Sequence, residues 1–549
     1  MKNTATFLLL VFVILFSTSS AIGQGTASRV TGTVTDEKGA AVPGAMVILT
    51  SEATDTSLTT ETTSAGAYVF DSVQVGTYTV TVEKSGFKKF VSTGNVANVN
   101  QPTTVNVTLE VGAIEQVVQV VAAAETVQTS NSGNFGNTVE QRSLEALPIV
   151  GDRGRNPLLF ISLQPGVIGN GRAGTGGNTG GNVHVHGARD RAFNFTLDGI
   201  DINESSAGGS NFTPLRPNPD SIEQFQVVTS NFTAELGRSS GAQVSLVTRS
   251  GTSDFHGTLF ELYRTPALNA NEYENNLNGR PKGQYVQHIF GGSVGGPVIL
   301  PGYNGRDKKT YFFTNLQMLR TQQGILVTRT VYTAQARQGL FRYRVGAANA
   351  PAGTANPSID GNGNPLPGLN IQTYNIPGND PLCATQPANC GLDPTTQALI
   401  NAAPLPNNFF VGDGLNTAGF SFSAPQIEKQ WDLVVKVDHT FNDRHSMYVR
   451  YAQGEQNTFG DNANGGLKSF PDSEFNFVDT FRNPKNVAVN YRWTLSPQVT
   501  NEFVVGLNKF AFSFTNPDPN GESNPFILNI PRDPFNFTPP INNLREITT

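Results

Sequence analysis

The chain has 549 residues, of which 15% are charged, and its formal net charge is −6. This length allows three or more domains. No long basic block is present, which removes the electrostatic footprint of a nucleic-acid-binding protein, so nucleic acid is not expected as a partner. Glycine (56) and proline (33) are both frequent, which favours turns and strands over long helices.

Residues 1–23 have the three-part pattern of a secretory signal peptide. Lys2 supplies a small positive region, residues 7–16 are an unbroken apolar run, and small residues follow it. The run is too short to span a bilayer as a helix, and no other segment approaches the roughly 18 apolar residues that a membrane helix needs. A buried N-terminal strand is the alternative. We therefore expect an exported protein that is either soluble or a β-barrel.

Residues 27–110 predict a β-sandwich. Two strands surround a turn at Asp36–Gly39, and short strands separated by glycine-containing turns continue the pattern. Five apolar side chains recur with period two, as a buried strand face requires. They are Tyr68, Phe70, Tyr78, Val80 and Val82.

The same stretch resembles the carboxypeptidase regulatory-like domain in "GTVTDEKGAAVPGAMV" and "SAGAYVFDSVQVGTYTVTVEKSGF". This resemblance implies a domain without hydrolase activity. The sequence agrees, because its first histidine is His184 and a zinc peptidase site needs His and carboxylate ligands around an open metal position. We expect a passive folding unit here.

Residues 111–135 change character and predict a linker. The apolar run "VVQVV" at 117–121 is followed by serine, asparagine and glycine, which is typical of a mobile segment that carries a sticky extended patch. The alternative is that this run forms the last strand of the sandwich.

Three segments within residues 136–250 follow one another in a recognisable order. They read "EQRSLEALPIVGDRGRNPLLFISLQPGV", "VHVHGARDRAFNFTLDGIDIN" and "DSIEQFQVVTSNFTAELGRSSGAQVSLVTRSGT". Together they resemble the plug domain of TonB-dependent outer-membrane receptors. The positions that match plug motifs are His186, Gly187, Asp198, Gly199 and Arg249, and His186 departs from the arginine that the family usually has there. Asp198–Gly199 is also a tight hairpin signal in its own right.

The resemblance gives the Val-rich run a second interpretation. In these receptors a short box near the plug pairs with the TonB protein by strand addition, which makes little demand on sequence. The candidates are Val117, Val118, Gln119, Val120 and Val121. The run ends in Val-Val-Ala rather than in a Val-Thr-Ala-like tail, so the sandwich-strand alternative stays open.

The histidines do not point to catalysis. We expect His184 and His186 on one face of a strand, where a metal site would need a third ligand and packing is the preferred interpretation. The sequence has no HExxH motif and no GxSxG nucleophile elbow. The chain is therefore predicted not to be an enzyme, and no cofactor is expected.

Residues 251–549 carry segments of alternating hydrophobicity, about ten residues each, as in membrane strands. They are Phe255–Arg264, Tyr285–Leu300, Thr310–Arg320, Gln430–Phe441, Ser446–Gly454, Asn486–Leu495 and Asn501–Phe514. The gaps between them are alternately long and short, which matches long outer loops and short periplasmic turns. In the longest gap, residues 324–333 predict an extra hairpin arm above the membrane. The same gap holds Cys383 and Cys390, for which export favours a disulfide.

Seven strands cannot enclose a plug, and by resemblance such barrels have roughly 22 strands. We therefore expect 251–549 to be an incomplete barrel and the chain to be a fragment or a truncated gene product. The predicted fold class is mainly β, with an N-terminal β-sandwich, an α+β plug and a partial antiparallel transmembrane β-barrel.

The resemblance implies energy-coupled uptake of a scarce ligand, such as an oligosaccharide, a peptide or chelated iron, through a plugged barrel in the bacterial outer membrane. The implied partners are TonB, outer-membrane lipid and an unknown extracellular ligand, with the N-terminal domain in the periplasm. A structural or adhesive surface protein is the alternative. A signalling receptor would usually carry a βαβ N-terminal domain, which this sandwich is not.

Overall fold

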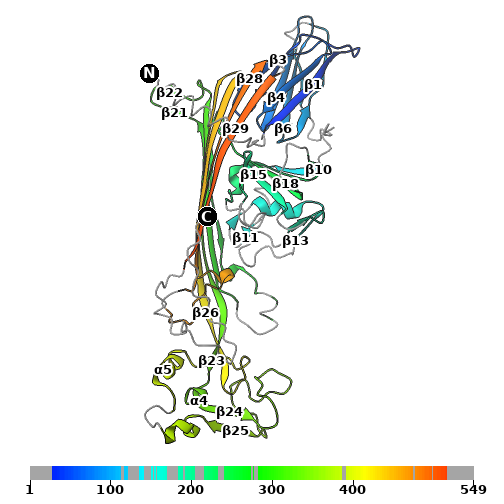
Figure 1. Ribbon diagram of the computed structural model, residues 1–549. Helices are drawn as coiled ribbons and strands as arrows, with labels where there is room; N and C mark the ends of the chain where they lie inside the picture. The colour runs from blue at the N-terminus through cyan, green and yellow to red at the C-terminus, as the bar shows by residue number, and fades with distance from the viewer. Residues whose placement is uncertain are drawn as a thin grey trace, which may run out of the picture.

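The computed structural model describes residues 27–112, 117–121, 135–140, 150–151, 154–155, 157–169, 183–188, 192–203, 215–232, 240–271, 273, 276, 282–385, 391–473, 476–496 and 499–515. The predicted signal peptide lies outside these ranges. Figure 1 shows a long sheet with the sandwich and the plug packed against one face, and a small subdomain at the far end of the sheet. No helix among the described residues is long and apolar enough to cross a membrane.

Residues 28–112 and 117–121 form a sandwich of two sheets. One sheet contains β1 (Ser28–Asp36), β4 (Ala67–Val73), β7 (Pro102–Thr104) and β8 (Val107–Leu109). The other has the order β3 (Ser57–Glu61), β2 (Met46–Ser51), β5 (Gly76–Glu83), β6 (Lys89–Ala97) and β9 (Val117–Val121). All five side chains of the predicted period-two pattern are buried in the core between the sheets. The alternation predicted this core because successive side chains of a strand point to opposite faces.

Strand β9 is the edge strand of the second sheet. It pairs with β6 in parallel, from Lys89↔Val117 to Thr93↔Val121. The Val-rich run therefore takes the position that the sequence left open as the last strand of the sandwich, inside the range expected to be a linker. Valines fit a half-buried pleated surface, and the edge of β6 offers unpaired backbone groups to such a segment.

The plug is built on a five-stranded sheet. Its order is β10 (Phe135–Glu140), β17 (Ile222–Ser230), β18 (Ala242–Thr248), β15 (Phe193–Leu197) and β16 (Ile200–Asp201). Strands β15 and β18 are parallel, whereas the other neighbours are antiparallel. Two small hairpins and two 3₁₀ turns complete its described part. They are β11 (Val150–Gly151) with β12 (Gly154–Arg155), β13 (Val167–Gly169) with β14 (Val183–Val185), η1 (Pro157–Leu163) and η3 (Pro219–Ser221).

The predicted hairpin at Asp198–Gly199 is present between β15 and β16. Asp198 has a φ of 49° and Gly199 a φ of 77°. Two successive positive φ values are what a two-residue type I′ turn requires, and Asp-Gly is a favoured sequence for it.

The expectation that His184 and His186 lie on one face of a strand is wrong. Strand β14 ends at Val185, and His186 and Gly187 turn away with φ values of 47° and 76°. The His186 backbone N–H donates to the Gly166 oxygen at 2.9 Å, while the His184 ring nitrogen Nδ1 bonds to the Ala188 oxygen at 2.9 Å. The turn therefore separates the two rings, because only an extended backbone keeps residues i and i+2 on one face.

The long sheet, which we name the wall, contains seven antiparallel strands in chain order. They are β19 (His256–Arg264), β20 (Tyr285–Pro297), β23 (Thr310–Tyr332), β26 (Thr417–Asn442), β27 (His445–Phe459), β28 (Asp479–Ser496) and β29 (Val499–Thr515). Each predicted membrane segment overlaps one of these strands. The alternation of connections is also present, because only two residues separate Asn442 from His445, whereas Tyr332 and Thr417 are joined by a long excursion.

The two faces of the wall differ in chemistry. On β27, Tyr448, Arg450 and Ala452 are buried toward the plug. On β29, Phe503 and Leu507 point away from the plug and are 57% and 75% exposed. An outward apolar face and an inward polar face are the pattern of a strand that separates lipid from a lumen.

The excursion between β23 and β26 forms a separate subdomain on an arm. Pairing of these two strands continues from Gly324↔Pro425 to Tyr332↔Thr417. This extension is about 30 Å long at 3.3 Å per residue, and it corresponds to the predicted hairpin arm. Residues 333–416, which we name the tip subdomain, follow at its end (Figure 1). They contain α4 (Ala334–Arg337), β24 (Leu340–Arg344), β25 (Ile371–Asn375), η5 (Pro377–Asn379), η6 (Pro381–Ala384) and α5 (Pro394–Ala402).

The remaining short elements belong to connections of the wall. They are η4 (Pro266–Leu268), the hairpin of β21 (Ile299–Leu300) with β22 (Tyr303–Asn304), and η8 (Asn462–Asn464).

Candidate functional site

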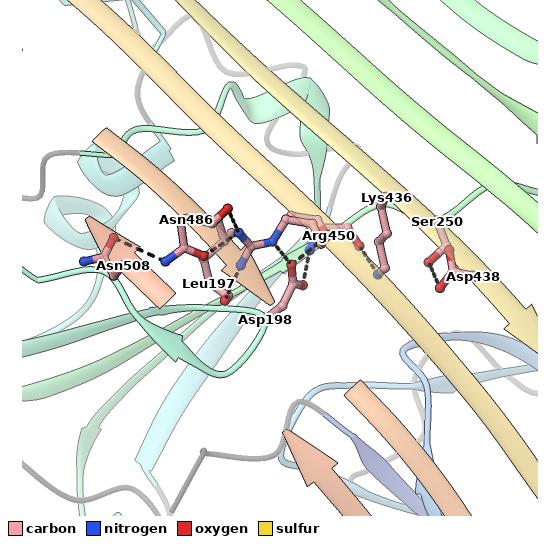
Figure 2. Close-up of polar contacts among 9 residues, drawn as sticks. Leu197, Asp198, Ser250, Lys436, Asp438, Arg450, Asn486 and Asn508 are labelled. Carbon is pink, nitrogen blue, oxygen red and sulfur yellow. Dashed lines mark hydrogen bonds and ion pairs between the residues drawn. The ribbon is translucent and has the colours of Figure 1, made fainter. Parts of the chain in front are cut away.

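The plug meets the wall at a buried ion pair. Asp198 stands at the β15–β16 turn of the plug, and Arg450 points inward from β27 of the wall. Arg450 Nε donates to Asp198 Oδ2 at 2.8 Å, and the two side chains are 0% and 1% exposed. Figure 2 shows the pair between Asn486 on one side and Lys436 on the other. The sole charged plug residue in this turn is thus neutralised by a cation of the wall.

The carboxylate of Asp198 is fully bonded. Thr248 at the end of β18 donates to it through its backbone N–H at 2.9 Å and its hydroxyl at 2.8 Å. Burial alone raises the pKa of Asp198, but the charges of Lys436 and Arg450, helped by the bonds from Thr248, outweigh it, and the pKa lies below its ordinary value. The ionised form of Asp198 is therefore the form that the closed plug stabilises.

The guanidinium of Arg450 connects the plug with two wall strands. Besides Asp198, it donates to the Leu197 oxygen at 2.9 Å and to both oxygens of Asn486 on β28. Asn486 in turn donates to Asn508 on β29 at 3.3 Å. A planar guanidinium with five donors is suited to such a junction, because it satisfies several acceptors at fixed angles.

Further polar contacts surround this centre. Lys436 Nζ donates to the Thr248 oxygen at 3.1 Å, and the Ser250 hydroxyl donates to Asp438 at 3.3 Å (Figure 2). The Arg249 guanidinium lies 5.5 Å from the centroid of the Phe313 ring on β23. Three successive polar residues at the end of the plug, Thr248, Arg249 and Ser250, thus each contact a side chain of the wall.

An apolar contact complements the ion pair. Ile200 of the plug packs with Tyr448 and Ala488 of the wall. A Cβ atom at Gly506 would come within 2.5 Å of Ile200 Cγ1 and of the Val487 oxygen. The wall strand β29 therefore approaches the plug at a distance that only glycine permits.

The contacts between the plug and the wall are noncovalent. The described residues contain no group of three or more His, Cys, Asp or Glu side chains that could hold a metal ion. The site contains a buried charge pair that lies among polar residues of the wall. If the plug moved away from the wall, each of the two charges would lose its partner.

Three protein-family models match the chain. The outer membrane beta barrel domain matches residues 247–549, the TonB-dependent receptor plug domain matches 154–244, and the carboxypeptidase regulatory-like domain matches 29–110. The chain belongs to the TonB-dependent outer-membrane receptors. These are receptors and transporters rather than enzymes, and they lie in the bacterial outer membrane with the plug and the N-terminal domain on the periplasmic side.

A curated relative of this TonB-dependent receptor is the TonB-dependent transporter Oar of Myxococcus xanthus, 28% identical over 328 residues. The match covers 56% of this chain and 29% of the relative. Among solved structures, the outer membrane transporter YddB of Escherichia coli is similar, with a TM-score of 0.41 and 13% identity over 70% of this chain and 40% of that chain. The siderophore receptor PirA of Acinetobacter baumannii gives a TM-score of 0.36 and 13% identity over 69% and 40%.

The residues predicted from plug motifs separate into two groups in this receptor. Asp198, Gly199 and Arg249 lie together where the plug meets the wall. His186 and Gly187 form a turn elsewhere, against Gly166. Their roles in the family's mechanism stay predictions.

The other two predictions concern the sandwich and the tip subdomain. Val117–Val121 form β9 of the sandwich, and their role as a TonB box stays a prediction. Cys383 in the tip subdomain is disulfide-bonded, but Cys390 lies outside the described residues, so the pairing of these two cysteines stays a prediction.

The wall partners of the plug were missed by sequence reasoning. Lys436, Arg450 and Asn486 are polar residues at inward positions of strands whose outward positions are apolar. A charge inside a membrane segment is costly and marks a functional position, so this signal was available in the sequence.

Proposed function

We propose that this protein takes up a scarce extracellular ligand across the outer membrane, and that TonB drives the uptake by moving the plug. The observation that carries the proposal is the closure of the plug on the wall through Asp198 and Arg450. Removing one partner of a buried ion pair typically costs about 3–5 kcal/mol. A contact of this size keeps the plug seated without ligand, yet lies within reach of mechanical work supplied by a partner.

Strand β9 supports the contact with TonB. It is an edge strand, and Val117 and Val120 are 57% and 42% exposed. An edge strand presents unpaired backbone groups to which an extended partner segment can add. In this structure the strand is also held by β6, so engagement by TonB begins either at its free edge or after it leaves the sandwich.

The tip subdomain supports an oligosaccharide as the ligand rather than a peptide or chelated iron. Phe341 and Tyr343 on β24 are 38% and 40% exposed, and their rings are stacked with centroids 6.2 Å apart and an interplanar angle of 20°. Tyr374, opposite Phe341 on β25, is 50% exposed. Gln372, opposite Tyr343, is exposed as well and donates to Asn370. Flat apolar rings beside neutral amides match a sugar, which has a C–H face and a hydroxyl edge.

This aromatic hairpin is held rigidly. The Asn416 side chain bonds to both backbone groups of Arg342, at 2.8 Å each. Arg337, at the end of α4 just before the hairpin, is buried and donates to the oxygens of Ala403 and Pro404. A surface with fixed geometry binds its ligand at a smaller entropic cost than a mobile loop does.

The experiment is uptake and growth of a strain that carries the protein, on a panel of neutral oligosaccharides, peptides and iron chelates, with and without TonB. We expect uptake of one neutral oligosaccharide class that requires TonB and that decreases in Phe341→Ala/Tyr343→Ala. Phe410→Ala, which removes a ring 63% exposed elsewhere in the tip subdomain, is the matched control and retains uptake. Uptake that is independent of TonB refutes the transport proposal, and uptake of peptides or iron chelates alone refutes the ligand class.

The adhesive surface protein remains the second candidate because the tip subdomain stands on an arm about 30 Å long. Adhesion predicts that cells bind a glycan-coated surface without any TonB-dependent uptake. The same panel therefore separates the two functions.

A further inference from the structure

One turn of the sandwich is bonded to one strand of the plug. The turn follows β6 directly, at residues 98–100. The Val99 backbone N–H donates to Gln224 Oε1 at 2.9 Å, and Gln226 Nε2 donates to the Val99 oxygen at 2.7 Å. Gln224 Nε2 also donates to Asn98 Oδ1 at 2.8 Å. The side-chain amides of Gln224 and Gln226 thus satisfy both the backbone N–H and the backbone C=O of Val99.

These contacts are buried and directional. Val99 is 0% exposed, and Gln224 and Gln226 are 4% and 2% exposed. The two glutamines are two residues apart on β17, so their side chains leave the strand on the same face. Because a buried polar group without a partner is costly, the turn can sit on β17 in one register only.

The sandwich is bonded to the wall as well. Ser72 accepts from Arg492 Nη1 through its backbone oxygen at 3.3 Å, and its hydroxyl donates to Glu502 at 3.3 Å. Tyr311 on β23 donates its hydroxyl to the Thr54 oxygen at 2.9 Å. Both groups of contacts lie toward the end of the wall where the connections are short.

We infer that the sandwich is a latch that holds the plug against the wall, with Gln224 and Gln226 as the positioning residues of its plug side. The sandwich is bonded to both bodies, so the plug cannot shift relative to the wall unless one of the two sets of contacts opens. Strand β17 pairs with β18, which carries Thr248 to Asp198. The latch is thus connected to the ion pair through a single sheet.

The same strand order connects the latch to β9. Strand β6 pairs with β9 and ends at the turn that holds β17. A force applied to β9 would therefore be transmitted through β6 to the turn at residues 98–100, which is hydrogen-bonded to the plug. This use of the latch rests on the proposed TonB-driven uptake, whereas the latch itself is tested without TonB or ligand.

The test uses the protein in outer membranes with spin labels at Lys38→Cys on the sandwich and Leu163→Cys on the plug, both at exposed positions, so that the measured distance spans the contacts that are removed. The variant Gln224→Leu/Gln226→Leu removes the grip. Each hydrogen bond of this kind is worth roughly a factor of five, so we expect the population with a displaced sandwich to rise at least about tenfold. Gln287→Leu, a glutamine 1% exposed in the wall that bonds to Thr321 at 3.3 Å, is the matched control and leaves the distance distribution unchanged.

A second readout separates the latch from a merely structural role. A loosened plug admits vancomycin, which is too large for ordinary outer-membrane pores, so cells with the leucine variant become more sensitive to it than cells with the control. Amide exchange in β2 and β5 reports whether the sandwich stays folded. If those strands lose protection, Gln224→Asn/Gln226→Asn, which keeps the amides but shortens their reach, decides the question. An unchanged distance distribution in the folded variant overturns the latch, whereas absent TonB-dependent uptake with an intact latch overturns only the proposed function.

Discussion

Replacement of Asp198 by asparagine is the most direct test of how the plug is held. The change keeps the size of the side chain and removes the charge that neutralises Arg450. Neither side chain is solvated, since they are 1% and 0% exposed. The guanidinium and the nearby Lys436 ammonium would then face each other in the lumen without the carboxylate between them (Figure 2).

The expected magnitude follows from this burial. Removing one partner of a buried pair costs about 3–5 kcal/mol. The ratio of seated to unseated plug should therefore fall by roughly two to four powers of ten. Arg450→Met should have an effect of similar size. The double variant should lose less than the sum of the two, because it leaves no lone charge behind.

The assay is amide exchange in β16 and β18 of the purified protein, which reports opening of the plug against the wall. Asp360→Asn, at a half-buried carboxylate of the tip subdomain, is the control and should leave exchange in the plug unchanged. Two results would refute the reasoning: unchanged exchange in Asp198→Asn, or losses in the two single variants that simply add in the double variant.

Three further predictions concern the same contacts and the tip subdomain. Because the pKa of Asp198 is lowered, its ionised form stabilises the seated plug above the ordinary carboxyl pKa, and this contribution is lost only as the pH falls through the lowered value. The protection factors of the β16 amides, which divide out the intrinsic pH dependence of exchange, should therefore stay constant between about pH 5 and 8. Gly506→Val should unseat the plug by contact with Ile200, whereas Leu507→Val on the outward face of the same strand should not, as chymotrypsin nicking of the plug would reveal. Peptide mapping without reductant should recover Cys383 joined to Cys390, and two separate thiols would contradict that pairing.

The parts of the fold that repeat a simple period could be predicted from the sequence. The seven wall strands were visible because lipid on one side and a lumen on the other impose alternation on every strand. The hairpin at Asp198–Gly199 was visible because its turn type accepts few residue pairs. Both signals are local, so no knowledge of distant residues was needed.

The parts of the fold that depend on contacts between residues far apart in the sequence could not be predicted. Asp198 and Arg450 are 252 residues apart, and nothing in either segment specifies which of the inward cations receives the carboxylate. The role of Val117–Val121 was ambiguous for the same reason, because an apolar alternating run fits any free sheet edge, and only the folded sandwich shows that β6 offers one. His186 was misplaced because a left-handed residue before glycine ends a strand without a proline or a charge to announce it.

The tip subdomain begins and ends at hydrogen-bonded neighbours, since Tyr332 and Thr417 face each other at the last pair of the arm. A segment whose two ends are already adjacent can be exchanged as a cassette without altering the strands that carry it. Under the proposed function, such an exchange would change the ligand that the receptor meets while the contacts between plug and wall are left untouched, and grafting a different domain at this pair is a practical route to testing it.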